Sequence, residues 1–510
     1  MKKLFILSLL SVCTAMNAQQ IEWGEYTKTE SQNSVCTYEG SIGSERFYSF
    51  GYYTTGMVAM FNKVGFVSFD NCQVRSNIKK LIKIPVYSLV SPVVTDKDVA
   101  VLYYKRSETD SKQRQLHALS LDKSTFEAVN DTVMFPLRQA DNLEMISSDD
   151  KTKHLVYYFA RENEKTAKNA ADVLVLYMYD RNFNLLWHQK LYNKTSSELT
   201  VRDMHIDKEG NFYAVATYWE DERAKDNYNE SLVLMAAGKD MAYNRIVELN
   251  QYVKQAKILP LNENEVFVGL NNETSFTSLV YSYAEGGIKG KTDYGLDYIL
   301  AKTKQNNAAY GKQSKEKSAA NDPRRGTHWA VSDILRLENG NVVAVIKDAF
   351  MVQISSTGAM PTYFEFTDRN FCVLCINPAD NNIVYSQMIS RGVKFTTHTG
   401  EDGGEYHKPY FFTMGNDFYA LYNAFAKEDE LSGELIRHAK VNFEKKPKGD
   451  NRSRLLKISS DGQDVAVQTI LDYKKDKAAF CYSMTGKDDD GNVIVGCKGD
   501  KGIRLGIIKF

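Results

Sequence analysis

The chain has 510 residues, of which 43% are hydrophobic, 25% charged and 12% aromatic, and its 64 basic residues balance 64 acidic ones. This length is ample for a large buried core, and the composition is that of an ordinary globular protein. The zero net charge argues against a dedicated nucleic-acid binder, which would carry a basic excess. With 31 Tyr and 25 Phe against only 9 Pro, the composition favours strands over helices.

The first residues, MKKLFILSLLSVCTAMNAQQ, have the pattern of a secretory signal peptide. Two lysines form a positive region, residues 4–12 are an almost wholly apolar run, and small residues follow at Ala15 and Ala18. We expect residues 1–18 to be removed and residues 19–510 to be exported to the periplasm, the outer membrane surface or the exterior. No later run approaches the roughly 18 apolar residues of a membrane-spanning helix. The alternative is an uncleaved N-terminal anchor.

Six cysteines remain after the expected cleavage, too few for a disulfide scaffold in a chain of this length. Cys372 and Cys375 lie in an apolar strand-like run, where residues three apart point to opposite faces. We therefore expect two buried cysteines there rather than a redox or zinc site. Cys481 and Cys497 flank the last predicted turn and should face each other across a hairpin. Directly opposite Cβ atoms lie about 4.5–5.5 Å apart, which allows a disulfide without requiring one.

A repeat runs along the chain. The segments IDKEGNFYAVA (206–216), RLENGNVVAVI (336–346) and KDDDGNVIVGC (487–497) align on Gly-Asn followed by alternating apolar residues. Their glycines suit a tight turn with a positive φ. More degenerate copies of the repeat are also present, and the first has its turn near residues 41–44. Together they give about eight repeats, whose turns are 64 residues apart on average.

Each repeat holds two successive hairpins, and the second hairpin is clearest at 173–191, 371–389 and 454–471. Four antiparallel strands repeated around an axis predict an all-β fold with little helix, a β-propeller of about eight four-stranded blades, with seven as the alternative. The weakest copy, 232–257, also fits a helix. The last repeat contains only three strands. Residues 20–28 are expected to supply the fourth, so that N- and C-terminal strands close the ring in one blade.

The Asp-x-x-Gly-Asn turn ahead of an alternating strand resembles the blade repeats of exported bacterial β-propeller proteins that serve in sensing and binding. The resemblance extends over almost the whole mature chain, and three copies keep the Gly-Asn. It implies a propeller fold. It implies no particular activity, because one fold serves many functions.

Antiparallel alternation places the A–B and C–D turns of every blade on one face of the ring and the B–C and D–A connections on the other. The first set is mostly short, whereas the second is long and charged. The largest insertions, at 301–329, 392–410 and 427–454, all belong to the second face, in blades five to seven. Segment 302–325 carries seven basic and two acidic residues, which is typical of a solvated loop. The functional alternative is a basic loop that binds an anionic partner.

Binding residues tend to occupy loops held by a rigid scaffold, so we predict that this second face is the working surface. Two aromatic residues would anchor a partner there and charged residues would select it. The candidates are Arg324, Arg325, His328, Trp329, His398, Glu405, Tyr406 and His407. We expect a cell-envelope binding or scaffold protein that recognises a protein or glycan partner and uses no cofactor. The alternative is a glycan hydrolase or lyase with His328, His398 and His407 at the mouth of the axis.

Two acidic clusters raise the question of a metal. The segment 392–410 holds His398, Glu401, Asp402 and His407, which are metal-ligand types without a rigid spacing. The turn KDDDGN would use Asp488 and Asp490 as calcium ligands, but Gly486 stands at the first ligand position of such a loop. An inter-strand turn of the last blade is the simpler interpretation. No nucleophile elbow, P-loop or dinucleotide fingerprint is present in the sequence.

Overall fold

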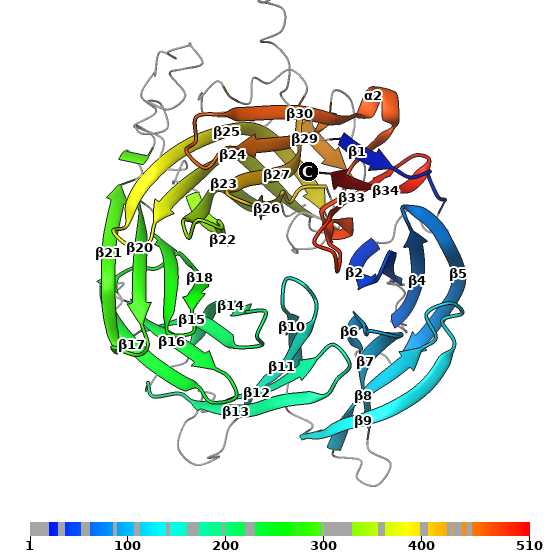
Figure 1. Cartoon of the computed structure of the whole chain (residues 1–510), viewed down its shortest axis with the longest axis horizontal. Helices are drawn as coiled ribbons and strands as arrows, with labels where there is room; N and C mark the ends of the chain where they lie inside the picture. Colours follow the sequence, from blue (N-terminus) through cyan, green and yellow to red (C-terminus); the bar gives the residue numbers. More distant parts are fainter. Residues whose placement is uncertain are drawn as a thin grey trace, which may run out of the picture.

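Eight antiparallel sheets surround a central axis, as Figure 1 shows. The computed structural model describes residues 20–28, 36–52, 62–84, 89–106, 113–138, 143–160, 173–195, 199–219, 230–272, 274–295, 298–299, 329–354, 363–397, 406–425, 431, 441–444 and 451–509. The expected β-propeller of eight four-stranded blades is confirmed. The segment 232–257, which also fitted a helix, forms strands.

Blades 1 to 4 follow one another along the chain, each built from its innermost strand outwards. Blade 1 contains β2 (Cys36–Ile42), β3 (Glu45–Tyr52), β4 (Asn62–Asp70) and β5 (Gln73–Ile84). Blade 2 contains β6 (Leu89–Val94), β7 (Val99–Arg106), β8 (Gln113–Leu121) and β9 (Ala128–Arg138). Blade 3 contains β10 (Leu143–Ser147), β11 (Lys153–Ala160), β12 (Val173–Asp180) and β13 (Leu185–Tyr192). Blade 4 contains β14 (Thr200–Ile206), β15 (Phe212–Trp219), β16 (Glu230–Ala237) and β17 (Ala242–Gln251).

Blades 5 to 7 continue this order. Blade 5 contains β18 (Gln255–Asn262), β19 (Glu265–Asn271), β20 (Ser275–Ser282) and β21 (Gly287–Gly295). Blade 6 contains β22 (Trp329–Arg336), β23 (Val342–Ile354), β24 (Tyr363–Asn377) and β25 (Asn382–Thr397). Blade 7 contains β26 (Tyr410–Met414), β27 (Asp417–Phe425), β29 (Asn451–Ile458) and β30 (Val465–Asp472).

Blade 8 joins the two ends of the chain. From the axis outwards it contains β31 (Ala478–Phe480) and β32 (Gly486–Lys487), then β33 (Val493–Gly499), β34 (Gly502–Lys509) and β1 (Gln20–Trp23). The short helix α2 (Tyr473–Asp476) precedes β31, and one 3₁₀ turn, η2 (Tyr482–Met484), separates β31 from β32. The guanidinium of Arg504 lies 5.1 Å from the ring centroids of both Trp23 and Tyr26. The prediction that the terminal strands close the ring in one blade is therefore confirmed.

The Gly-Asn repeat is a capped turn. The Asp207 carboxylate accepts the backbone N–H of Asn211 at 2.7 Å and its side-chain amide at 3.0 Å, while Gly210 adopts a φ of 87°. In the last blade the Asp488 carboxylate accepts the backbone N–H of Asn492 at 2.8 Å. The aspartate therefore satisfies turn donors, and the glycine supplies a positive φ that other residues avoid.

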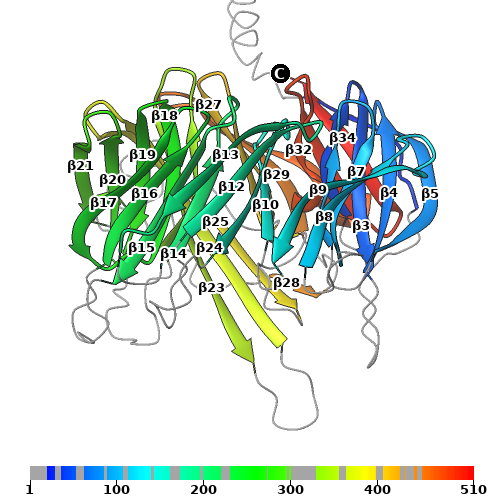
Figure 2. The same cartoon turned by 90° about the horizontal axis from the view of Figure 1, so that it is seen from below.

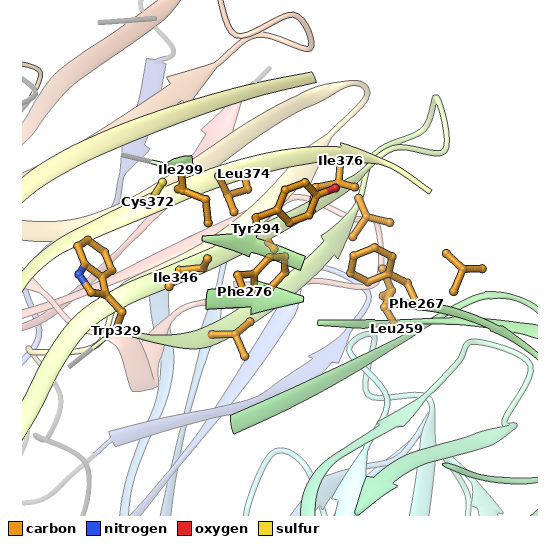
Figure 3. Close-up of a cluster of buried hydrophobic side chains, with 14 of the residues drawn as sticks. Leu259, Phe267, Phe276, Tyr294, Ile299, Trp329, Ile346, Cys372, Leu374 and Ile376 are labelled. Atoms are coloured by element: carbon orange, nitrogen blue, oxygen red, sulfur yellow. The ribbon is translucent and has the colours of Figure 1, made fainter. Parts of the chain in front are cut away.

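Apolar side chains fill the seams between neighbouring blades. Sixteen buried residues pack between blades 5 and 6. Phe267, Phe276 and Ile346 are among those labelled in Figure 3. Cys372 belongs to this seam, whereas Cys375 packs in the seam between blades 6 and 7. The two cysteines thus point to opposite faces of β24, as their spacing predicts, and both are buried.

Polar side chains also clamp the inner strand of the next blade. The Asn271 side chain accepts the N–H of Val331 at 2.8 Å and donates to the Trp329 carbonyl oxygen at 2.9 Å. The Tyr104 hydroxyl accepts the N–H of Leu143 at 3.0 Å and donates to its carbonyl oxygen at 2.8 Å. These bonds satisfy the backbone where each inner strand begins and fix how adjacent blades meet.

The prediction that Cys481 and Cys497 face each other in blade 8 is wrong, because the strand pairing is shifted by one residue. Cys497 lies opposite Phe480, and the N–H of Cys481 donates to the Gly496 carbonyl oxygen at 2.9 Å before the chain turns into η2. A shift of one residue reverses the face of the sheet. The two thiols consequently pack in different apolar clusters, and both are buried without forming a disulfide.

Blade 6 is longer than its neighbours, and β23, β24 and β25 project beyond the ring in Figure 2. The strand β28 (Val441–Glu444) lies within the third predicted insertion and pairs in parallel with β25, with Val393 opposite Val441. The second predicted insertion begins inside β25, so residues 392–397 are strand rather than loop. Within the described ranges, no helix has the length and apolar character needed to cross a membrane.

Candidate functional site

A cavity of about 710 Å³ lies among the inner strands, whose arrangement Figure 1 shows. Its lining residues come from blade 1 and from blades 3 to 8. The repeat therefore brings together side chains that are hundreds of residues apart in the sequence. A concave site of this volume with a few converging polar groups is typical of ligand binding.

Aromatic side chains from blades 1, 7 and 8 form one wall of this axial cavity. They are Tyr38 in β2, Tyr410 at the start of β26 and Tyr482 at the start of η2. The rings of Tyr410 and Tyr482 lie 6.1 Å apart between centroids. Burial raises the pKa of Tyr38 and Tyr410, so both phenols stay protonated and can donate hydrogen bonds.

Blades 3 to 6 form the opposite wall, where charged and polar groups stand among apolar side chains such as Met204, Leu259 and Ile334. Asp203 pairs with Lys257 of the next blade at 2.9 Å and accepts the N–H of Ile258 at 3.0 Å. His205 and Asp333 line the same wall from β14 and β22. The cavity thus sets phenol rings on one side against carboxylate, ammonium and imidazole groups on the other.

Lys487 lies on the aromatic side of the cavity. Its Nζ donates to the Thr413 carbonyl oxygen at 3.4 Å, and its own carbonyl oxygen accepts the Tyr38 hydroxyl at 3.0 Å. Burial lowers the pKa of the Lys487 ammonium, and the carboxylate of Asp149 partly opposes this shift. The ammonium is therefore partly desolvated, and within the described ranges only one of its three donors has a protein acceptor.

A second cavity of about 460 Å³ adjoins the axial one at the A–B turns, which we call the turn face. The two cavities share Ser148, Asp149, His205, Leu259 and Arg336 in their linings. The acidic residues of the A–B turns that line the second cavity are Asp149, Asp150, Asp207, Glu209 and Glu263. A ligand reaching the axial cavity from the turn face would pass these carboxylates.

Arg181, in the β12–β13 turn of blade 3, connects several blades on the turn face. It donates to the carbonyl oxygens of Val94 in blade 2, at 3.0 Å, and Ser41 in blade 1. It also pairs with Asp489 of blade 8 at 3.1 Å. These bonds hold blade 3 beside blades 1 and 8. This arrangement is consistent with the lining of the axial cavity, to which blade 2 contributes no residue.

The predicted binding residues fall into two groups. Trp329, Tyr406 and His407 are described and buried, with 7%, 4% and 2% of their surface exposed. They therefore present no anchor at the surface, and His407 does not belong to the lining of the axial cavity. The other candidates lie outside the described residues, namely Arg324, Arg325, His328, His398 and Glu405. For those five, the predicted role stays a prediction.

His407 belongs instead to a buried charged cluster between blades 6 and 7. Arg391 donates to Asp368 at 2.7 Å and to the His407 carbonyl oxygen. Lys347 also pairs with Asp368, at 3.0 Å. Burial alone would raise the pKa of the Asp368 carboxyl, but the positive charges of Lys347 and Arg391 outweigh burial and lower it. The cluster supports the projecting strands rather than a ligand.

The predicted calcium ligands have other roles in the structure. Asp488 caps its turn and pairs with Arg46 of blade 1 at 2.7 Å, with both side chains buried. Asp490 is exposed in the same turn. In the described part of the chain, no three His, Cys, Asp or Glu side chains gather into a metal-binding group. The other metal candidates, His398, Glu401 and Asp402, lie outside the described residues.

Sequence reasoning did not select the residues of the axial cavity. His205, Lys257, Asp333, Tyr410 and Lys487 stand in or beside inner strands that read only as parts of blade repeats. A signal was present, because inner-strand residues near the repeated turns line the cavity in seven of the eight blades. Polar and aromatic residues at those positions could have been collected from the aligned repeats.

No protein-family model and no curated protein sequence matches the chain. The Dos1 propeller is similar over 97% of this chain and 98% of that chain, with 9% identity and a TM-score of 0.43. The propeller domain of the Trilobed protease from Pyrococcus furiosus covers 88% of this chain and 98% of its own, with 10% identity and a TM-score of 0.33. Prolyl oligopeptidase B from Galerina marginata matches 92% of this chain and 56% of its own, at 7% identity and a TM-score of 0.36. These likenesses concern the general fold.

Proposed function

We propose that the protein is an exported binding propeller that holds part of a saccharide chain in its axial cavity. The observation that carries the proposal is the division of the cavity into an aromatic wall and a wall that carries charged and polar groups. Tyr410 and Tyr482 stand on one side, and Asp203, His205 and Asp333 stand on the other. The three described candidates on the second face, Trp329, Tyr406 and His407, are buried, so the axial cavity is the better supported site.

The chemistry of a sugar ring suits these two walls. One face of the ring exposes C–H groups, which pack against the electron-rich face of an aromatic side chain. Its edge carries hydroxyl groups that donate to carboxylates and accept from protonated groups. The volume of about 710 Å³ is sufficient for a few sugar units.

Titration calorimetry with a panel of neutral and acidic oligosaccharides tests this function. We expect Tyr410→Ala and Tyr482→Ala to weaken binding by about tenfold, since each removes a stacking surface worth about 1.5 kcal/mol. Tyr192→Ala is the matched control, because Tyr192 is 52% exposed on the outer strand β13 and far from the lining. Binding that survives in both cavity variants, or no binding by the folded wild type, would refute the proposal.

The oligosaccharides used in these titrations also serve to test the alternative function, a glycan hydrolase or lyase. Of the three histidines in that hypothesis, the described one, His407, lies in the charged cluster between blades 6 and 7. Chromatography of the oligosaccharides after incubation distinguishes the two functions. A binding protein returns them intact, whereas an enzyme shortens them.

The proposal includes export. In support of it, β1 begins at Gln20, two residues beyond Ala18, the last residue of the expected signal peptide. Removal of the leader would leave the strand that closes the ring intact. Intact-mass measurement of the protein recovered from its native host should find a chain that begins at residue 19. A chain that still begins at Met1 would contradict export with cleavage.

A further inference from the structure

The positively charged residues around the axial cavity differ in how far they are already paired. Lys257 is held by Asp203 at 2.9 Å, and Arg336 donates to the Leu261 carbonyl oxygen. Lys151 stands on the β10–β11 turn at the rim and is partly exposed to water. Lys487 differs from all three, because it is partly desolvated and its single hydrogen bond is a long one to a carbonyl oxygen.

An ammonium group in this state is a site for an anion. Its charge is not neutralised by any described carboxylate within 4.0 Å, since Asp149 acts on it from farther away. Two of its three N–H donors have no acceptor among the residues that the structure describes. A ligand anion would supply those acceptors, and a hydrogen bond to a charged group contributes more than one between neutral groups.

The position of Lys487 relative to the aromatic wall defines the ligand further. Tyr482 precedes it by five residues in blade 8, and Tyr410 of the neighbouring blade stands beside Tyr482 at 6.1 Å. The Tyr38 hydroxyl, at 3.0 Å, holds the backbone of Lys487 in place. A sugar ring against Tyr410 and Tyr482 would therefore place a ring substituent near the ammonium.

We propose that the saccharide is acidic, with its anionic group bound to Nζ of Lys487 and its ring packed on Tyr410 and Tyr482. This inference rests on the proposed function. The anionic group is a carboxylate, as in a uronic acid, or a sulfate ester, since both offer the same acceptor oxygens. On the opposite wall, Asp333 and the Asp203–Lys257 pair are placed to form hydrogen bonds with the hydroxyl groups of the sugar.

The test uses matched probes that differ only in charge. Uronic acid oligosaccharides are titrated beside their methyl esters, and a sulfated galactan oligosaccharide beside its desulfated form. Lys487→Met keeps an unbranched side chain that is one heavy atom shorter and removes the charged ammonium. We expect it to weaken binding of the acidic probe by about tenfold or more, the loss of one hydrogen bond to a charged group. Binding of the neutral probe should stay within about twofold.

Two variants act as controls. Lys487→Arg keeps the positive charge and should retain most of the affinity for the acidic probe. Lys509→Met removes a lysine of blade 8 that belongs to neither cavity lining and whose side chain is 59% exposed, and it should change neither titration. Thermal unfolding of Lys487→Met reports whether the ring is intact, and its midpoint should equal or exceed that of the wild type because a desolvated charge has been removed.

The outcomes separate this inference from the function on which it rests. Loss of acidic binding alone in Lys487→Met supports the inference, and the probe that responds identifies carboxylate or sulfate. Equal binding of acidic and neutral probes by the wild type, or acidic binding that is unchanged in Lys487→Met, overturns the inference and leaves saccharide binding standing. Absence of all saccharide binding overturns both.

Discussion

Both sides of blade 6 bury an apolar seam, and the side toward blade 7 adds a buried charged cluster. Toward blade 5, Phe267, Ile346 and Leu374 belong to a seam of sixteen buried apolar residues. Toward blade 7, sixteen buried apolar residues form a similar seam, and Asp368 and Arg391 add a buried ion pair in which neither side chain is exposed. Removing atoms from an apolar seam lowers the free energy of unfolding in proportion to the number of atoms removed. A buried charge that loses its partner costs more, because neither a counter-charge nor water then solvates it. The contrast teaches where this ring is most sensitive to a single substitution.

The largest effect is expected from Asp368→Asn. This variant keeps the shape of the side chain but leaves Arg391 and Lys347 buried without a counter-charge. We expect a loss of about 3–5 kcal/mol in the free energy of unfolding, measured by urea denaturation. Glu22→Gln is the control, because its ion pair with Lys509 is exposed and should contribute less than about 1 kcal/mol. Equal losses in the two variants would show that the buried pair has no special role.

His154 represents a third case, an ionisable group buried without a counter-charge. Its Nδ1 lies 2.9 Å from the Ser147 hydroxyl, and burial, followed by the charges of Lys151 and Arg181, lowers its pKa to about 3. In the unfolded chain the pKa returns to about 6.5. Its neutral form therefore stabilises the fold fully above about pH 6.5, and that stability is lost as the pH falls toward 3.

At pH 5 the cost of keeping His154 neutral is about 2 kcal/mol. His154→Gln should remove this dependence, so that its free energy of unfolding falls less than that of the wild type between pH 7 and pH 5. Urea denaturation at the two pH values measures the difference. The same slope in both proteins would exclude His154 as the source of acid sensitivity.

A smaller effect is expected within the apolar seam. Ile346→Val removes one methylene from a fully packed position between blades 5 and 6, and it should cost about 1 kcal/mol. Denaturant titration should show a lower midpoint with an unchanged slope. A loss as large as that of Asp368→Asn would mean that the two sides of blade 6 do not differ.

The smallest effect concerns the thiols. Cys372 and Cys375 lie in the two seams of blade 6, and burial raises the pKa of Cys375 to about 12. Because all six cysteines from Cys36 onward are buried and form no disulfide, a reducing agent should leave the thermal midpoint unchanged. Alkylation of the unreduced, denatured chain followed by mass spectrometry should label Cys481 and Cys497. Absence of label on both would indicate the bond that the register argues against.

The limits of sequence-based prediction follow from particular residues. The turn at Asp207–Asn211 was recognisable because an aspartate, a glycine and an asparagine at that spacing satisfy a local backbone. The register of Cys481 was missed because the strand ends at Phe480 and a 3₁₀ turn begins, which no local pattern marks. Trp329 and Tyr406 read as surface anchors but are covered by neighbouring blades, and their exposure depends on residues far away in the chain.

The sequence by itself determined the elements that depend on near neighbours. Alternating apolar residues, capped turns and their regular spacing predict eight four-stranded blades and the closing strand at residues 20–28. The tertiary structure alone decided the site. Closing the ring brings Tyr410, Lys487 and Asp203 to one cavity, although Asp203 is separated from the others by more than two hundred residues. Such an encounter is set by how the seams pack around the axis, and no local pattern in the chain encodes it.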